Sequence, residues 1–214
     1  MGYIDMHTHH EPVLANVTSI LHCAPDRVSF QRPFSVGIHP WFIQHDNLEE
    51  DLHLLKEALS HKNCLAIGEC GMDKVIKVDF KLQQTVFEHQ IQLSETFQKP
   101  MIIHCVKAYS EVLALRKRYK AKQQWIIHGY RKNRLLAKQL LDHGILLSFG
   151  AALLNDLELQ NLVQELPLDR FFLETDDEAI SIQSIYQEVS KLKQRSLFEV
   201  QEHISNNFNS IFIR

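Results

Sequence analysis

Eight short apolar runs of strand length recur along this chain of 214 residues, and their spacing limits the possible folds more than any other feature. Several of the runs are continuously hydrophobic, as in Met101-Ile102-Ile103 and Trp125-Ile126-Ile127. Parallel strands that are buried on both faces have this pattern. The predicted strands span residues 3–6, 18–23, 34–38, 64–68, 100–104, 124–128, 145–149 and 171–174.

Amphipathic helices are expected between most of these runs, because leucine-rich stripes recur there at helical spacing. Two more stripes, over residues 182–192 and 200–211, predict that the C-terminal part is helical. Capping and helix-stopping residues bracket several of the predicted helices. These boundary residues are Asn47, Ser110, Asn133, Gly144, Asn155 and Pro167.

The alternation of strands and helices implies right-handed βαβ units and a parallel sheet. Eight strands in one domain of this size favour an α/β fold closed as a (β/α) TIM-type barrel over an open doubly wound sheet. Only about a dozen residues separate the first two strands, and fewer separate the next two. We therefore expect one domain over residues 1–214, a trimmed barrel whose first crossover helices are shortened or missing.

Composition excludes some classes of function and favours others. The formal net charge of −3 provides no basic surface for passive nucleic-acid binding. No apolar run approaches the length of a membrane span, and the four cysteines lie in or beside apolar runs as reduced thiols would. A cytoplasmic protein is expected, without a membrane or an obligate protein partner. Thirteen histidines are many for this length and point to a metal site.

Chemistry on a parallel barrel collects at the carboxyl ends of the strands. His7 and His9 stand at the end of the first strand, and side chains two apart in extended backbone point to the same face. Imidazole and carboxylate groups are the ligands of divalent metals such as zinc, manganese and iron. Asp5, two residues before His7, is expected to point its side chain between the two histidines and orient a ligand. The strand-end candidates are His7, His9, His39, Glu69, His104, His128 and Asp176.

The other histidines lie mostly in predicted helices or loops and are expected to be structural or solvent-facing. They are His10, His22, His45, His53, His61, His89, His143 and His203.

Six short motifs together carry a resemblance to a known family. They are Asp5-x-His7-x-His9, Gly37-x-His39-Pro40, Gly68-Glu69-x-Gly71-x-Asp73, Ile103-His104-Cys105, Ile127-His128-Gly129-Tyr130 and Glu174-Thr175-Asp176. In order and spacing the chain resembles the TatD-related deoxyribonucleases, which belong to the metal-dependent amidohydrolase-like barrels. The resemblance extends from the first strand to the Asn207-Phe208 region of the last helix.

This resemblance implies a barrel with two divalent metal ions (zinc, manganese, magnesium or iron) that hydrolyses phosphodiesters, with DNA as the named substrate. By motif match, one metal would be held by His7, His9, Glu69 and Asp176. The other would be held by Glu69, His104 and His128, so that Glu69 bridges the two ions.

Three residues are expected to act in catalysis. Glu69 would bridge the metals, and Asp176, beside the attacking water, would both bind metal and act as general base. His39, followed by Pro40, would contact a phosphate oxygen, or alternatively only order its loop. Positive charge near the site could come from Lys74, Lys107, Arg131 and Lys132.

The chain departs from the family where a substrate would be gripped. The family usually has an arginine and then an acid after the fifth-strand histidine, where this chain has Val106 and Lys107. After Asp176 it has Asp177-Glu178-Ala179 in place of a small residue, a proline and a long basic loop. We therefore expect small phosphodiesters or single-stranded DNA ends as substrates. A hydrolase of a small amide, ester or lactone, and a metal-binding barrel without turnover, remain alternatives.

Overall fold

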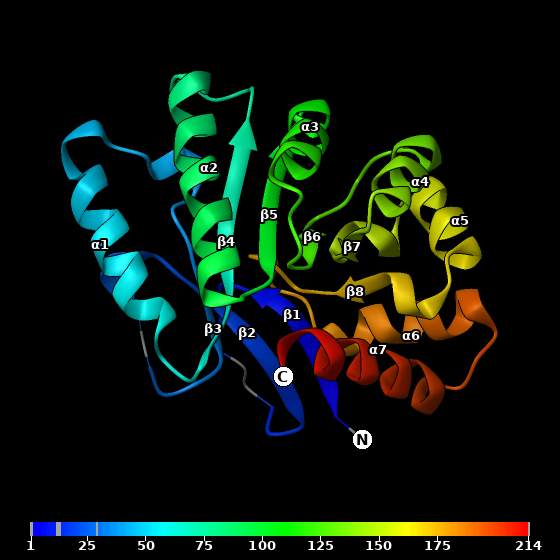
Figure 1. The fold of residues 1–214 in the computed structure, drawn as a ribbon. Coiled ribbons are helices and arrows are strands. Elements are labelled where there is room, and N and C mark those ends of the chain that lie inside the picture. Colours follow the sequence, from blue (N-terminus) through cyan, green and yellow to red (C-terminus); the bar gives the residue numbers. More distant parts are fainter. Residues whose placement is uncertain (1, 12–13, 29, 214) are drawn as a thin grey trace. The chain divides into compact units, whose positions relative to one another are not determined.

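Strands and helices alternate along the chain (Figure 1). The computed structural model of the protein describes residues 2–11, 14–28 and 30–213. The chain divides into two compact units. Residues 1–21 and 128–214 form the first unit, and residues 22–127 form the second.

All eight predicted strands are present at their predicted places. Inside the first unit β1 pairs in parallel with β2, and β7 with β8. Inside the second unit β3, β4, β5 and β6 pair in parallel in chain order. The strands are β1 (Tyr3–Thr8), β2 (Val17–Cys23), β3 (Phe34–Val36), β4 (Cys64–Asp73), β5 (Met101–Val106), β6 (Trp125–Ile127), β7 (Ile145–Phe149) and β8 (Phe171–Leu173).

The fourth strand is longer than the sequence predicted. β4 runs to Asp73 instead of ending at residue 68. Its register with β5 shifts between Ile67 and Cys70, and the pairing then continues through Gly71↔His104 to Asp73↔Val106. Ladder hydrogen bonds use the backbone and need no apolar side chains, so the apolar pattern ends before the strand does. The prediction that Glu69 ends the strand was therefore wrong.

The helices also lie where the apolar stripes predicted them. Asn133 caps α4 by accepting a hydrogen bond from the backbone N–H of Leu136, and Gly144 follows its C-terminus, as expected. No helix in the described part of the chain is long and apolar enough to cross a membrane. The helices are α1 (Leu48–Leu59), α2 (Phe80–Phe97), α3 (Tyr109–Tyr119), α4 (Arg134–Asp142), α5 (Leu157–Glu165), α6 (Ile182–Lys193) and α7 (Leu197–Phe212).

Two predicted caps were wrong, and a third was right in position only. Asn47 is the N-cap residue of α1, as predicted, but its side chain makes no capping bond and donates instead to the side-chain oxygen of Gln44. α3 begins one residue before Ser110, which lies inside its first turn. Asp156 caps α5 in place of Asn155 by accepting two backbone hydrogen bonds. Which residue caps a helix depends on local backbone angles, and neighbouring polar side chains compete for the same backbone N–H groups.

The first two crossovers are trimmed, as predicted. Between β1 and β2 the described residues 9–11 and 14–16 contain no helix. Between β2 and β3 the only helical element among the described residues is the short 3₁₀ turn η1 (Pro25–Arg27). Two further short turns, η2 (Pro40–Phe42) and η3 (His45–Asn47), lead from β3 into α1.

Two buried glutamines of α2 fix the backbone around the ends of β3 and β4. The Gln90 amide accepts a hydrogen bond from Ile38 N–H at 2.8 Å and donates to the Ile38 carbonyl at 3.1 Å. Gln83 makes the same pair of bonds with the backbone of Asp73, at 2.8 Å and 3.0 Å. Each pair satisfies two backbone groups that no ladder bond reaches. These clamps set the positions of His39 and Asp73.

Candidate metal centre

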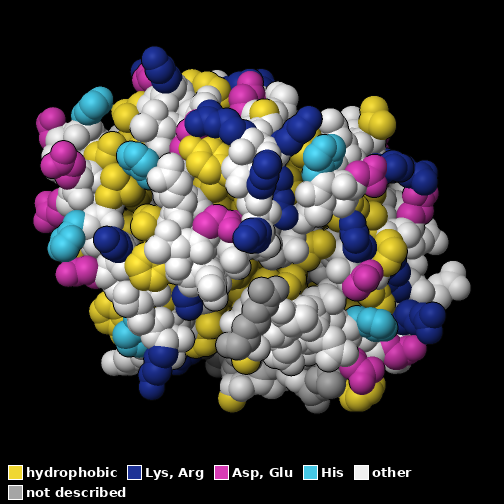
Figure 2. Space-filling view, in the orientation of Figure 1, with side chains coloured by type: hydrophobic (Ala, Val, Ile, Leu, Met, Phe, Trp, Pro, Cys, Tyr) yellow, Lys and Arg dark blue, Asp and Glu magenta, His cyan; other side chains and the backbone are white. Residues whose placement is uncertain are grey.

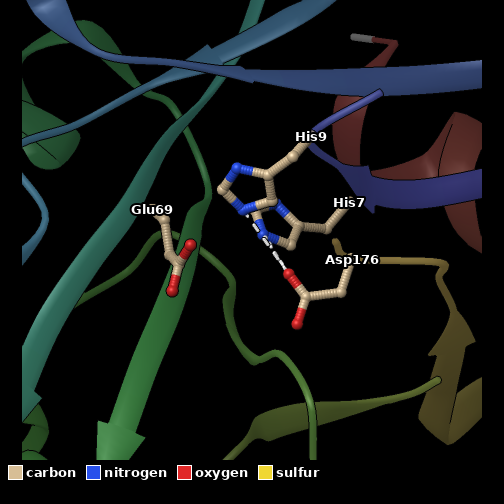
Figure 3. A group of neighbouring side chains, drawn as sticks. All are labelled: His7, His9, Glu69 and Asp176. Atoms are coloured by element: carbon tan, nitrogen blue, oxygen red, sulfur yellow. Dashed lines mark ion pairs between the residues drawn. The ribbon is translucent and has the colours of Figure 1, made fainter. Parts of the chain in front are cut away.

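In the first unit, His7, His9 and Asp176 converge at the end of β1. His7 Nε2 and His9 Nε2 each lie 3.5 Å from Asp176 Oδ1 (Figure 3). Backbone hydrogen bonds hold the segments together: Asp176 N–H donates to the His7 carbonyl at 3.0 Å, and His9 N–H donates to the Asp176 carbonyl at 2.9 Å. Asp176 has a φ of 57°, which turns its side chain toward the histidines.

The electrostatic setting keeps Asp176 ionised. Burial alone would raise the pKa of this carboxyl group. Hydrogen bonds from His7 and His9, and the charge of His128, outweigh burial and hold the pKa of Asp176 well below its usual value. A carboxylate that remains charged at neutral pH and faces imidazole nitrogens is a suitable ligand for a divalent cation.

His128 and Glu174 extend this group within the same unit. His128 Nδ1 lies 3.7 Å from Glu174 Oε1 and 4.0 Å from Asp176 Oδ2. Glu174 is fully buried and accepts a short hydrogen bond from the backbone N–H of Gly129. Donor atoms of His128, Glu174 and Asp176 all lie within 4.8 Å of one another, a spacing that suits a single metal ion.

In the second unit, Glu69 is the centre of a separate group. Its Oε1 lies 2.7 Å from His104 Nδ1 and 3.0 Å from His39 Nε2. Figure 3 draws Glu69 on β4, where its side chain is almost fully buried. Donor atoms of His39, Glu69 and His104 also lie within 4.8 Å of one another. Two imidazoles and a carboxylate at this spacing again fit a divalent metal.

Asp73 and Trp41 support this second group. Asp73 Oδ2 lies 3.4 Å from His104 Nε2 and accepts a hydrogen bond from the indole N–H of Trp41 at 2.8 Å. Burial would raise the pKa of Asp73, but hydrogen bonds from Val75 N–H, Trp41 and His104 lower it. A charged carboxylate behind a histidine fixes the ring and makes it a better ligand.

Gly71 permits β4 to approach β5 at this point. A Cβ atom on this residue would overlap the carbonyl oxygen of His104, and its φ of 141° disfavours other residues. Glu69, Gly71 and Asp73 therefore belong to one structural arrangement, in which the two acids flank His104.

The structure brings the predicted ligands together in two sets. His7, His9, His128 and Asp176 meet in the first unit, while His39, Glu69 and His104 meet in the second. The described residues thus place each strand-end candidate beside at least one other.

Asp5 does not bond to either neighbouring histidine in the way the sequence suggested. Its carboxylate accepts hydrogen bonds from the backbone N–H and the hydroxyl of Thr175, at 2.9 Å and 2.7 Å. Burial raises the pKa of Asp5 to about 7, against these hydrogen bonds. Asp5 thus orders the backbone just before Asp176 and supports the site from there.

Sequence reasoning missed four residues of the site. His22 was expected to be structural or solvent-facing, but its Nδ1 accepts a hydrogen bond from Glu69 N–H at 2.9 Å, which leaves the proton on Nε2. Asp73 and Glu174 stand in motifs that were recognised without a role for either acid. Trp41 carried no signal beyond its place two residues after His39.

Parallel strands that end in buried imidazoles and carboxylates define a metal-binding α/β barrel protein. The chain belongs to the TatD related DNase family, whose model matches residues 24–213.

A metal-dependent hydrolase of Haemophilus influenzae, described as uncharacterized, is 29% identical over 172 residues, which are 76% of this chain and 63% of that protein. The human 3'-5' RNA nuclease TATDN2 is 29% identical over 147 residues, which are 65% of this chain and 19% of that protein. This chain therefore spans less than two thirds of the length of these relatives.

Among solved structures, the TatD homolog YJJV from Escherichia coli k12 superposes with a TM-score of 0.84. The match covers 99% of this chain and 98% of that one, at 19% sequence identity. This likeness confirms the fold class, a TIM-type α/β barrel, that the strand and helix pattern predicted.

Proposed function

We propose that this chain is a divalent-metal-dependent hydrolase of phosphodiesters, acting on small phosphodiesters or on single-stranded DNA ends. The observation that carries the proposal is the pair of buried donor sets, His128 with Glu174 and Asp176, and His39 with Glu69 and His104. Membership of the TatD related DNase family supports the choice of reaction. The RNA nuclease TATDN2 supports a nucleic-acid substrate.

The ligand assignment in this proposal follows the family motifs: one ion would be held by His7, His9, Glu69 and Asp176, and a second by Glu69, His104 and His128. When bound, two divalent ions would polarise the phosphate and lower the pKa of a nearby water. Each unit carries only part of this ligand set, so residues 1–214 would have to act as one domain.

The chain's own residues would perform the remaining steps. The ionised Asp176 carboxylate would accept the proton of the attacking water. His39 Nδ1 accepts a hydrogen bond from Trp41 N–H at 3.1 Å, and its Nε2 lies 3.0 Å from Glu69 Oε1. When Glu69 binds metal, this Nε2–H would donate to a phosphate oxygen instead. Asp73 and Trp41 would hold the His104 ring in place.

The surface charge supports small or single-stranded substrates over long duplex DNA. Figure 2 shows lysine and arginine side chains gathered in the upper middle of that face, with acidic and apolar ones around them, while the chain as a whole has a formal net charge of −3. Long nucleic acids need phosphate neutralisation along their length. Four free, buried thiols support a location in the reducing cytoplasm.

A substrate screen tests the proposal. The protein is purified, its bound metal is measured, and a chelator-treated sample is reloaded with zinc, manganese, magnesium or iron(II). Each sample is assayed with bis(p-nitrophenyl) phosphate, a phosphomonoester, a carboxylic ester, a lactone and single-stranded DNA. We expect metal-dependent hydrolysis of the diester. Turnover of the ester or lactone alone would favour the second class of hydrolase, and bound metal without turnover of any substrate would favour a binding protein.

A further inference from the structure

A cavity opens beside His39, entirely within the second unit. It has a volume of about 310 Å³ and is bordered by η1, by the residues that follow β3, and by the start of α1. This volume is at the lower end of the range for small-molecule sites. Residues that line it include His22, Pro25, His39, Phe42, Gln44 and Asp51.

The cavity borders the metal-binding group of the second unit. His39 lines it and lies 3.0 Å from Glu69, and His22, which also lines it, accepts the Glu69 N–H hydrogen bond. A molecule whose phosphate lies at His39 would therefore extend its next chemical group into this cavity.

One wall is apolar and aromatic. Phe42 is 67% exposed, although exposure of a large apolar side chain to water is unfavourable. Its ring centroid lies 5.5 Å from that of His39. Pro25 and Ile38 add apolar surface to the same lining. An exposed aromatic ring beside the histidine that is proposed to contact phosphate is suited to stacking on a flat heterocycle.

The other part of the lining is polar and offers hydrogen-bond acceptors. The Gln44 side-chain oxygen accepts from the Asn47 amide at 3.3 Å, and Asp51 lies half-buried at the start of α1. Burial raises the pKa of Asp51, and the charges of Asp26 and Glu50 raise it further. A hydrogen bond from a neutral N–H donor, such as the exocyclic amine of a nucleobase, would stabilise the carboxylate in this setting.

We propose that this cavity binds the base of a nucleotide whose phosphate lies at His39, with Phe42 stacking on the ring and Asp51 accepting from an amino group. The proposal rests on the proposed function and deepens it, since it selects nucleotides from among phosphodiesters. It also predicts that bases with an exocyclic amine bind more tightly than bases with a carbonyl at that position.

Equilibrium binding tests the proposal without turnover. Trp41, 54% exposed and next to Phe42, reports through its fluorescence, while Trp125 is fully buried. The protein as purified is titrated with dCMP, with dUMP, which carries a carbonyl in place of the amine, and with deoxyribose 5-phosphate, which has no base. We expect dCMP to bind on the order of tenfold more tightly than deoxyribose 5-phosphate, because stacking of the base on an aromatic side chain contributes enough binding free energy for that difference.

Matched variants separate the contributions of Phe42 and Asp51 to dCMP binding. Phe42→Ala should weaken dCMP binding about tenfold, whereas Phe198→Ala, which removes another exposed phenylalanine in α7, should leave it unchanged. Asp51→Asn should reduce the preference for dCMP over dUMP. Trp41→Phe identifies the reporter by removing the fluorescence change.

Each outcome decides one point. Equal binding of dCMP and deoxyribose 5-phosphate overturns the base subsite, even if the protein hydrolyses diesters. Equal binding of dCMP and dUMP overturns the part assigned to Asp51. Base-dependent binding that Phe42→Ala weakens supports the subsite, even if no diester is hydrolysed and the proposed function is wrong.

Discussion

His104 reaches Glu69 through its Nδ1 atom, 2.7 Å from the same carboxylate oxygen that lies 3.0 Å from His39. In the ligand assignment that follows the family motifs, Glu69 serves both metal ions, so Glu69→Ala should lose both. Elemental analysis of the purified variant measures this. Glu57→Ala, at a side chain that is 65% exposed, is the matched control and should keep the metal content of the wild type. Two metal ions per chain in the Glu69→Ala protein would show that the assigned bridge is wrong.

Asp73 should tune metal affinity through His104. Asp73→Asn keeps the shape of the side chain and removes the charge that faces His104 Nε2. Because partners of a ligating histidine typically contribute 10- to 100-fold to metal affinity, we expect a loss of about tenfold or more. Competition with a fluorescent chelator measures it. Asp79→Asn, at the cap of α2, is the control, and equal affinity in the Asp73 and Asp79 variants would exclude this supporting role.

Asp176 should separate metal binding from turnover. Asp176→Asn retains an oxygen donor but loses the proton acceptor, so metal content should fall modestly while the rate falls on the order of a hundredfold or more. The rate is measured with a small chromogenic diester at saturating metal. The exposed neighbour Asp177 is the control, since Asp177→Asn should hydrolyse this small substrate at the wild-type rate. Near-normal turnover by Asp176→Asn with metal bound would remove Asp176 from the mechanism.

Acidic residues after Asp176 should limit activity on DNA. Glu178 Oε1 lies 3.8 Å from Arg131, so this acid offsets a cation that could otherwise contact phosphate. Replacing Asp177 and Glu178 by their amides should raise the rate of single-stranded DNA cleavage at low salt, because it lowers repulsion of the backbone.

Glu165→Gln with Asp169→Asn changes the net charge equally at exposed positions and serves as the control for this pair. The small-diester rate should be alike in all three proteins. Unchanged DNA cleavage in the Asp177 and Glu178 variant, or efficient duplex degradation by the wild type at physiological salt, would contradict the expectation.

The buried thiols should be chemically inert in the folded protein. Burial raises the pKa of Cys64 and Cys105 to about 12 and that of Cys70 well above its usual range. The reactive thiolate forms only as pH approaches a pKa from below, so at pH 8 almost none is present. A thiol reagent should modify these cysteines slowly in the native state and rapidly in guanidinium. Fast native modification would show that these thiols are more accessible than the structure indicates.

The sequence predicted the fold well because burial on both faces leaves a strong apolar signal. Each strand was found from its hydrophobic run, and the short spacings predicted that the described residues of the first two crossovers contain no α-helix. The β4 boundary could not be found in this way, since Cys70 to Asp73 pair with β5 through their backbones and do not form a continuous apolar run. The choice of Asp156 over Asn155 as the cap of α5 could not be predicted either, because both residue types can cap a helix and the backbone angles decide between them.

The candidate site was predictable where a histidine or acid follows an apolar run. Asp73 was recognised in a motif but given no role. The predicted strand ended at residue 68, so nothing indicated that Asp73 would lie on the same face of β4 as Glu69. His22 was set aside because one histidine in a short strand has no distinguishing pattern. The contact of Trp41 with Asp73 joins residues 32 positions apart, a distance that periodicity cannot span.

The extended β4 ladder has a consequence for how the protein acquires its ions. Backbone pairing with β5 continues beyond Glu69 to Asp73, so the carboxylate is fixed by the sheet and not by a flexible loop. A ligand that is already in place loses little conformational freedom when an ion arrives. We therefore expect the chain to remain folded after chelation and to exchange one divalent ion for another without unfolding. Under these conditions the supply of metals around the protein, more than the folding reaction, would decide which ion it carries.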